Sequence, residues 1–397
     1  MSKVRESKVP GFELVGKEER EEINQLFDDG GILFAHGFDA IRNGRYRVRE
    51  FEKAFADKIG VKYAQAVSSG TAAIKVALFA AGVRPGDEVI TQAFTFIATV
   101  EAIIDLGAKP ILVNVNDTLN LDPIELKKAI TPRTKAIVPV HMLGVACEMD
   151  KIQEIATEFN LAIIEDNCES LGARWNGKYL GTDSLACAWS FDAGKVIITG
   201  EGGMVTTNDE EVYKLAREYH DHGHEYNTKF PRGRDTHRIR GFNYRMSELQ
   251  AAIGLAQLKK LDFIVSKNIE NYNIYFEALK DLPNISFRRI PYKSQPLCDC
   301  LIFQLDTTEK AKWVVTEMNQ QGLGTKNVPD AIEWHFARYW DHMLVELGMS
   351  KKELIDTMEP SERELSRSVA IPILVKMDKN TITSNAEKLV SILKKVN

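Results

Sequence analysis

The sequence predicts an α/β fold with a mostly parallel sheet, and two observations support this prediction. From residue 60 onward, short apolar runs alternate with amphipathic stretches of helical period. Several of the short runs are apolar on both faces, as strands covered by helices on two sides must be. Alternation of this kind is typical of a layered domain in which helices cover both faces of a sheet.

Seven of the apolar runs are predicted to be strands of one sheet: Tyr63–Val67, Glu88–Gln92, Pro110–Val115, Lys135–Val140, Ala162–Asp166, Ala186–Phe191 and Gly202–Thr207. Helical patterns accompany them at Thr71–Ala81, Thr95–Leu106, Met149–Phe159 and Asp209–Tyr219. The last two strands are too close together for a helical crossover, so we expect an antiparallel turn through Thr199–Gly202. The predicted sheet is therefore seven-stranded, mixed and mostly parallel.

A long helical pattern from Ser247 toward Asp281 leads away from this sheet. A strand-like stretch at Leu301–Leu305 follows, with helical patterns at Thr308–Gln320 and Thr383–Val396. These elements predict a smaller α/β lobe. We therefore expect two domains: a large domain over residues 1–257, which includes an N-terminal segment, and a small C-terminal domain over residues 258–397.

Composition excludes several classes of function. The 397 residues contain 51 Lys plus Arg and 56 Asp plus Glu, and the resulting net charge of −5 gives no reason to expect a nucleic-acid partner. No run approaches about 20 uninterrupted apolar residues, and the charged start lacks the apolar core of a signal peptide, so we expect a cytoplasmic protein without a membrane partner. The histidine-rich run at residues 220–224 crowds its side chains, so a loop is preferred and no metal is assigned.

Ser69, Gly70 and Thr71 follow the first predicted strand and open a helix. A glycine-permitted turn with hydroxyls at a helix start suits a phosphate, although such residues are more often ordinary helix caps. Neither a G-x-x-x-x-G-K-[ST] nor a G-x-G-x-x-G motif follows that strand. Readings as an ATP-binding or dinucleotide-binding protein therefore lose support.

Two further segments place chemically active residues after strands. Asp166 ends the strand Ala162–Asp166, with Glu169 shortly after it, and Ser190 lies near the end of the strand Ala186–Phe191, with Lys195 shortly after it. An acid at a strand end is often a turn former, and a lone lysine often lies across the surface. In combination, however, an acid at one strand end with Ser and Lys after another suits a phosphorylated pyridine aldehyde held as a Schiff base.

With these residues the chain resembles the sugar aminotransferases of the DegT/DnrJ/EryC1/StrS family, which are pyridoxal-phosphate (PLP) enzymes of fold type I. The resemblance runs from about residue 10 to near the C-terminus. Its markers in this sequence are Ser69–Ala73, Gly86–Ile90, Phe94–Phe96, Pro139–His141, Glu165–Asp166, Ser190–Phe191, Lys195, Thr199–Gly203 and Asn243–Met246.

The resemblance implies roles for three side chains around the cofactor ring. Lys195 matches the lysine that holds PLP covalently and then moves the proton at the substrate carbon, work that calls for a lowered pKa. Asp166 matches the acid that keeps the pyridine nitrogen protonated, so that the ring can accept electrons. Phe96 matches an aromatic residue that stacks on the ring, and an ordinary core phenylalanine is the alternative.

The resemblance also implies how the phosphate is held. Ser190 matches a phosphate ligand, together with the helix start at Ser69, Gly70 and Thr71. Asn243 matches a residue that family members donate to the phosphate of the neighbouring subunit. We therefore expect a homodimer with shared active sites.

Three positions depart from the family pattern. Glu169 stands where many relatives have Gln or His near the cofactor's phenolic oxygen, and a carboxylate there would repel a phenolate unless it is neutralised. Asp192 occupies a position that is often His, and Val196 replaces a common Asn. The last two leave the transamination machinery intact and point to a different substrate pocket.

The resemblance implies an aminotransferase that takes its amino group from L-glutamate. Trp189–Lys195 and the chain as a whole most resemble the members that convert an 8-oxo-3,8-dideoxy-octulosonate sugar acid to its 8-amino form (8-amino-Kdo) for lipopolysaccharide synthesis. We therefore expect this sugar acid as the substrate. Its carboxylate calls for an arginine, and a solvated basic stretch is the alternative reading of the four candidates, Arg42, Arg45, Arg47 and Arg49.

Three other functions are weighed against this one. An aminotransferase acting on a nucleotide-linked keto-deoxy sugar fits the same motifs. A cofactor-dependent sugar dehydratase resembles the chain as well, but such relatives carry His at the position of Lys195, which favours transamination. A cofactor-binding regulator would need a recognition helix or a basic face, and neither is apparent in the sequence.

Overall fold

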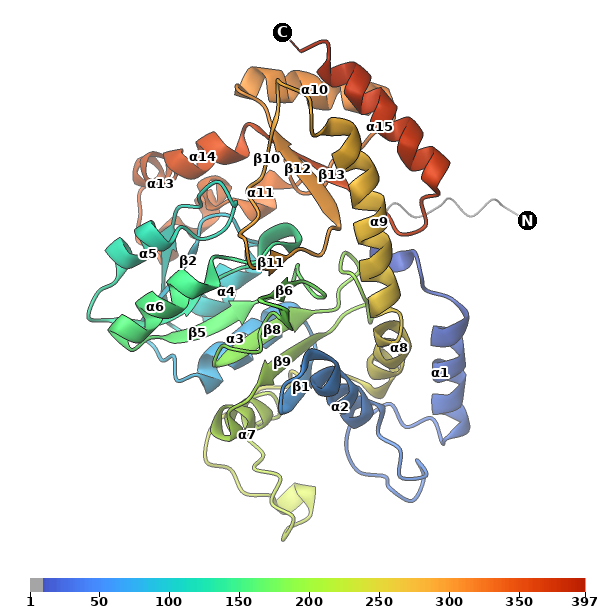
Figure 1. Ribbon diagram of the computed structural model, residues 1–397. Helices are drawn as coiled ribbons and strands as arrows, with labels where there is room; N and C mark the ends of the chain where they lie inside the picture. The colour runs from blue at the N-terminus through green and yellow to red at the C-terminus, as the bar shows by residue number, and fades with distance from the viewer. Residues whose placement is uncertain (1–9, 397) are drawn as a thin grey trace.

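The computed structural model describes residues 10–396, and its central feature is a seven-stranded sheet (Figure 1). The strands, in spatial order, are β1 (Tyr63–Val67), β9 (Gly203–Thr207), β8 (Ala186–Ser190), β5 (Ala162–Asp166), β4 (Thr134–Val138), β2 (Glu88–Gln92) and β3 (Lys109–Val113). Strand β9 is antiparallel to both of its neighbours, and the other pairs are parallel. The predicted α/β class, the mixed sheet and the antiparallel turn before β9 are confirmed.

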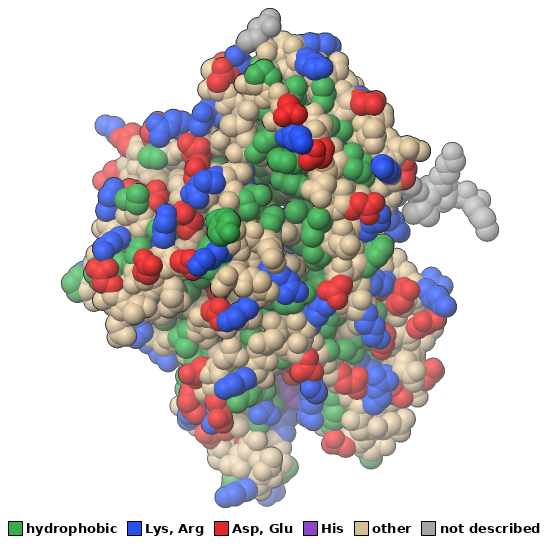
Figure 2. Space-filling view, in the orientation of Figure 1, with side chains coloured by type: hydrophobic (Ala, Val, Ile, Leu, Met, Phe, Trp, Pro, Cys, Tyr) green, Lys and Arg blue, Asp and Glu red, His purple; other side chains and the backbone are tan. Residues whose placement is uncertain are grey.

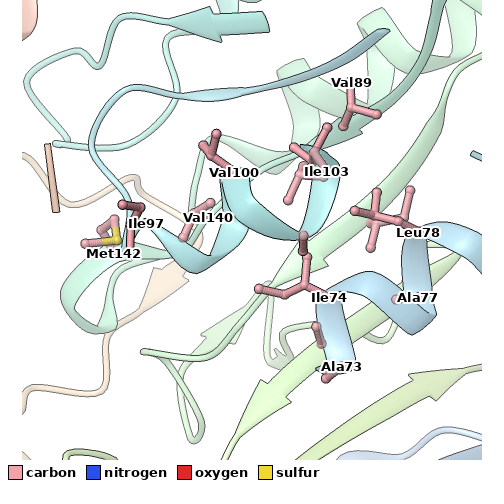
Figure 3. Packing of buried hydrophobic residues seen from close by; sticks show 14 of the residues in the cluster. Ala73, Ile74, Ala77, Leu78, Val89, Ile97, Val100, Ile103, Val140 and Met142 are labelled. Carbon is pink, nitrogen blue, oxygen red and sulfur yellow. The ribbon is translucent and has the colours of Figure 1, made fainter. Parts of the chain in front are cut away.

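The strands of this sheet place apolar side chains on both of its faces, and helices cover each face. Along β4, Ala136 and Val138 join one apolar cluster and Ile137 joins another. The first cluster includes side chains of α3 (Gly70–Ala80), α4 (Ala98–Asp105) and α7 (Glu210–Tyr219). Figure 3 shows Ile74 and Leu78 of α3 close to side chains of α4 in this cluster.

The opposite face is covered by two groups of helices. One group consists of α5 (Pro123–Ala129) and α6 (Met149–Phe159), and the other of α2 (Arg47–Ile59) and α8 (Glu248–Leu258). Phe51 and Phe55 of α2 pack against Trp189 and Phe191. Helix α1 (Lys17–Asp28) packs on α8.

A second, smaller lobe follows α8, at the top of Figure 1. Helix α9 (Leu261–Leu279) leads to an antiparallel sheet of β10 (Ser286–Phe287), β12 (Cys300–Gln304) and β13 (Ser368–Pro372). This sheet shares an apolar cluster with α9, α10 (Thr308–Gln320) and α15 (Lys379–Leu393). The long helical pattern predicted from Ser247 is thus two helices, α8 and α9. A third sheet is small and consists of β11 (Ser294–Gln295), β6 (Arg174–Trp175) and β7 (Lys178–Tyr179).

The segment between α10 and β13 folds back on the large sheet. Its helices are α11 (Ile332–His335), α12 (Leu344–Leu347), α13 (Lys351–Thr357) and α14 (Glu359–Leu365). Their apolar side chains join the cluster of α3 and α4, which also contains Cys300, Ile302 and Ala370 of the small sheet. Short 3₁₀ turns lie at Pro10–Phe12, Met142–Gly144, Arg232–Arg234, Ala337–Tyr339 and Asp341–Met343. The domain boundary between residues 257 and 258 falls in the last turn of α8 and stays a prediction, and residues 1–9 lie outside the described part.

The surface shown in Figure 2 carries Lys and Arg side chains interspersed with Asp and Glu. Within residues 10–396, no helix is both long enough and apolar enough to cross a bilayer.

Candidate active site

The predicted site residues converge on one cavity at the carboxyl ends of β1, β5 and β8. Its volume is about 280 Å³. Eight of the nine predicted cofactor residues line it: Ser69, Gly70, Thr71, Phe96, Asp166, Glu169, Ser190 and Lys195. This edge of an α/β sheet is where ligands are commonly bound. The ninth residue, Asn243, lies elsewhere.

The start of α3 forms a cradle at one end of the cavity. The Ser69 side chain caps the helix by accepting a hydrogen bond of 3.1 Å from the N–H of Ala72, so the capping role weighed for it is confirmed. A Cβ added at Gly70 would lie 2.7 Å from Cβ of Ser190, so only glycine permits this close approach. The first N–H groups of a helix lack intrahelical partners, and together with the Ser190 hydroxyl they suit a phosphate.

Asp166 is buried at the end of β5, and two hydrogen bonds fix its carboxylate. Oδ2 accepts from the Thr99 hydroxyl at 2.7 Å, and Oδ1 accepts from the Cys168 N–H at 3.1 Å. The Thr99 hydroxyl lies 2.7 Å from that of Thr95. Sequence reasoning missed both threonines, because their helical pattern gives no sign that a carboxylate from another strand lies against them.

Lys195 faces two carboxylates. Its Nζ lies 3.6 Å from Oε1 of Glu169 and 3.8 Å from Oδ2 of Asp192. Burial alone would lower the pKa of Lys195, but the two carboxylates outweigh it and raise the pKa. The residues of the chain alone therefore do not supply the lowered pKa that the proton transfer calls for, and its lowering beside the bound cofactor stays a prediction.

Glu169 connects Lys195 to the C-terminal part of the chain. Its Oε1 lies 3.5 Å from Nε2 of His335 and accepts a 3.4 Å hydrogen bond from Asn327. Burial would raise the pKa of Glu169, but Lys195 and His335 hold it well below its ordinary value. Glu169 is thus a charged carboxylate beside Lys195, and its role toward the cofactor stays a prediction. Sequence reasoning missed Asn327 and His335, which lie more than 150 residues away along the chain.

Phe96 is not a core residue. Its side chain is 41% exposed, lines the cavity and lies with its ring centroid 5.3 Å from that of His335. The alternative of an ordinary core phenylalanine is therefore excluded, and the ring is available to a ligand in the cavity.

Asn243 is exposed on the segment between α7 and α8, outside the cavity of its own chain. Its Oδ1 accepts only a long 3.5 Å hydrogen bond from the N–H of Arg245 among the side-chain bonds of the described residues. Figure 1 shows the segment between these two helices extending from the body of the molecule.

The four arginines considered for a substrate carboxylate have other partners. Arg42 and Arg47 are buried, and they contact Glu248 and Asp29 respectively. Arg45 pairs with Glu50 at 2.8 Å, and Arg49 stacks on the Tyr46 ring. None of the four is among the described residues that line the cavity.

The histidine-rich run 220–224 begins directly after α7, as its loop assignment requires. Its buried Asp221 pairs with Arg232 at 2.6 Å and with Arg245 at 2.5 Å. Over residues 10–396, no group of three or more His, Cys, Asp and Glu side chains is placed to hold a metal ion.

A model of the DegT/DnrJ/EryC1/StrS aminotransferase family matches residues 35–390. The chain belongs to this family. GDP-perosamine synthase of Caulobacter vibrioides is 49% identical over 223 residues, which cover 55% of this chain and 58% of that protein, less than two thirds of its length. The spore coat polysaccharide biosynthesis protein SpsC of Bacillus subtilis is 32% identical over 387 residues, which cover 96% of each chain.

Among solved structures, NtdA of Bacillus subtilis with bound cofactor PMP is 28% identical and aligns with a TM-score of 0.81, over 96% of this chain and 83% of that one. The family expected from the sequence is therefore confirmed, and with it the PLP fold type I and the PLP cofactor. The cradle at Gly70 and the buried carboxylate of Asp166 fit the phosphate and the ring nitrogen of that cofactor.

Proposed function

We propose that the chain transfers an amino group from L-glutamate to a nucleotide-linked keto-deoxy sugar, with PLP held in the cavity around Lys195. The observation that carries the proposal is the convergence of Lys195, Asp166 and the start of α3 on one cavity, in a chain of an aminotransferase family. The dehydratase alternative loses support because its relatives carry His where this chain has Lys195.

The residues divide the work by their chemistry. When bound, PLP supplies an electron sink for the carbon that loses its proton. The Lys195 amine would hold the cofactor covalently and afterwards move the proton, and the Asp166 carboxylate would keep the ring nitrogen protonated. The start of α3 and the Ser190 hydroxyl would bind the phosphate, and Phe96 would cover a face of the ring.

The comparisons favour a nucleotide-linked sugar over the free octulosonate acid expected from the sequence. A relative with 49% identity over its aligned part is a GDP-perosamine synthase, whereas neither curated relative described above is named for an octulosonate. The arginines considered for the octulosonate carboxylate also lie outside the cavity within the described residues. The nucleotide-linked sugar therefore replaces the octulosonate acid as the preferred substrate, and the octulosonate acid becomes the competing hypothesis.

One spectroscopic experiment tests the substrate class. Each amine that is a substrate converts the absorbance of PLP-loaded enzyme to that of the pyridoxamine form in a single half-reaction, so three amines can be compared directly: L-glutamate, GDP-perosamine and 8-amino-3,8-dideoxy-octulosonate. We expect conversion by the first two, and none with the Lys195→Ala variant. Conversion by the octulosonate amine but not by GDP-perosamine would replace this proposal with the octulosonate hypothesis.

We further propose a homodimer in which Asn243 of each chain reaches the cofactor phosphate of its partner. Support comes from the exposure of Asn243 and its place outside its own cavity. At a PLP concentration that loads the wild type but too low to load Asn243→Ala homodimers, co-expression of Lys195→Ala with Asn243→Ala should restore about a quarter of the wild-type activity, because half of the dimers are mixed and each mixed dimer has one intact site. A fully active monomer would contradict this arrangement.

A further inference from the structure

Asp221 lies in the long connection between α7 and α8, and it is fully buried. In the described part of the chain, this connection contains a single regular element, the short 3₁₀ turn at Arg232–Arg234. A connection of such length with so little regular structure is uncommon in a compact domain and usually has a function. Its shape depends on individual contacts, and Asp221 makes several of them.

Four side chains from separate positions of the chain converge on the Asp221 carboxylate. Oδ1 accepts hydrogen bonds from Arg232 at 2.6 Å and from Arg245 at 2.5 Å. Oδ2 accepts a hydrogen bond from the Tyr226 hydroxyl at 2.6 Å and lies 3.3 Å from Nε2 of His36, in the N-terminal segment. Burial would raise the pKa of Asp221, but its hydrogen-bond partners hold the pKa well below its ordinary value, so the buried group is charged.

The segment that carries Asn243 lies directly against Asp221. The two residues are opposite one another in an antiparallel bridge, and the N–H of His222 donates to the carbonyl of Phe242 at 2.9 Å. Arg245, two residues beyond Asn243, is held by the Asp221 carboxylate. A buried charge that pairs with this arginine therefore fixes the backbone next to Asn243, while the amide of Asn243 stays at the surface.

We infer that Asp221 is a positioning residue for the cofactor phosphate of the partner chain, because it fixes the segment from which Asn243 reaches that phosphate. Asp221 is not among the described residues that line the cavity of its own chain, so it acts through Asn243. A donor that is held in place before its ligand arrives loses less freedom on binding. The inference rests on the proposed homodimer, and its test separates the two.

The test compares PLP with pyridoxal, which lacks the phosphate. Asp221→Asn keeps the size of the side chain and removes the charge that holds the two arginines. The Kd of PLP should rise by roughly tenfold, to about the value in Asn243→Ala, because both variants lose one well-placed hydrogen bond to the phosphate. The Kd of pyridoxal should change by less than about twofold in either variant. Asp117→Asn is the matched control, since Asp117 also pairs with an arginine, Arg289, but at the surface; it should change neither Kd.

A double variant shows whether Asp221 acts through Asn243. Asp221→Asn combined with Asn243→Ala should bind PLP no more weakly than Asn243→Ala alone, because the contact that Asp221 supports is already absent. A further loss in the double variant refutes the inference. An equal loss of PLP and pyridoxal affinity in Asp221→Asn also refutes it, because it indicates a general effect on the fold. Light scattering should show that Asp221→Asn is still a dimer, and a variant that dissociates refutes the inference too.

Asn243→Ala decides the proposed dimer arrangement, and Asp221→Asn decides the inference. Wild-type PLP affinity in Asn243→Ala refutes both. Weaker binding in Asn243→Ala together with wild-type affinity in Asp221→Asn refutes the inference alone. If Asp221→Asn fails to fold, Arg245→Gln removes the other partner of the same pair, and the same measurements are expected to give the same results.

Discussion

Replacing Thr99 by valine should loosen the carboxylate on which the cofactor ring depends. The Thr99 hydroxyl donates a 2.7 Å hydrogen bond to Oδ2 of Asp166, and both residues are buried. Valine has nearly the same shape, so the change removes this hydrogen bond without leaving a large cavity. A hydrogen bond to a charged group contributes about 1.5–3 kcal/mol, and a buried carboxylate oxygen that loses its donor is costly.

In a chain of this length that energy corresponds to a fall of roughly 2–4 °C in the midpoint of thermal unfolding, since the unfolding entropy scales with the number of residues. Calorimetry of the cofactor-free protein measures it. Thr99→Ser restores the hydroxyl and should recover most of the loss. Thr157→Val is the control, because Thr157 is exposed and, within residues 10–396, its hydroxyl donates only to the carbonyl of Gln153 in its own helix.

The same variant should retain less PLP after dialysis, because a carboxylate that can rotate is a poorer partner for the ring nitrogen. Unchanged unfolding and unchanged PLP retention in Thr99→Val would refute the reasoning, since Asp166 would then be held without Thr99.

Two further predictions concern titrating groups. Glu169→Gln should lower the pKa of Lys195, because it removes a carboxylate 3.6 Å from the ammonium. Mass spectrometry can follow the chemical modification of Lys195 in cofactor-free protein as a function of pH. A profile that does not shift in the variant contradicts this prediction. Burial lowers the pKa of His220 to about 4. Since an unfolded histidine takes up its proton near pH 6.5, His220 makes the protein less stable as the pH falls from about 6.5 to 4, by about 1.4 kcal/mol per pH unit. His220→Gln should reduce that slope in unfolding experiments across the same range, and an equally steep slope in the variant would show that other groups cause it.

The strands of the large sheet could be predicted because each carries its own signal. Strands β1, β2 and β5 have the predicted bounds, and the other four lie within two residues of theirs. Short runs that are apolar on both faces and bounded by turn residues are typical of buried strands and too short for helices. Helix α2 was missed because the basic stretch at its start has the composition of a solvated surface. Arg47 is buried instead, and its partner Asp29 lies in a segment for which no local pattern indicates contact.

The residues of the candidate site also fall into two groups, those that a local pattern indicates and those that it does not. Residues at the ends of strands or shortly after them, such as Asp166, Ser190 and Lys195, could be placed because the ends of parallel strands meet at one edge of the sheet. Thr99, Asn327 and His335 could not, since each contributes through a contact between distant segments.

The phosphate end of the cofactor cavity leads to a last prediction. Among the lining residues between positions 10 and 396, Lys195 is the only lysine or arginine, whereas four carboxylates are present. A phosphate would therefore be held by neutral donors: the helix start, Ser190 and, in the proposed dimer, the partner's amide at position 243. Asn243→Ala should weaken PLP binding about tenfold, as for one hydrogen bond to a charged group. Asn243→Asp should weaken it further, because none of the described residues that line the cavity is an arginine that could offset a carboxylate placed against the phosphate. Equilibrium titration with PLP distinguishes these variants, and wild-type affinity in both would mean that a single chain holds the phosphate unaided.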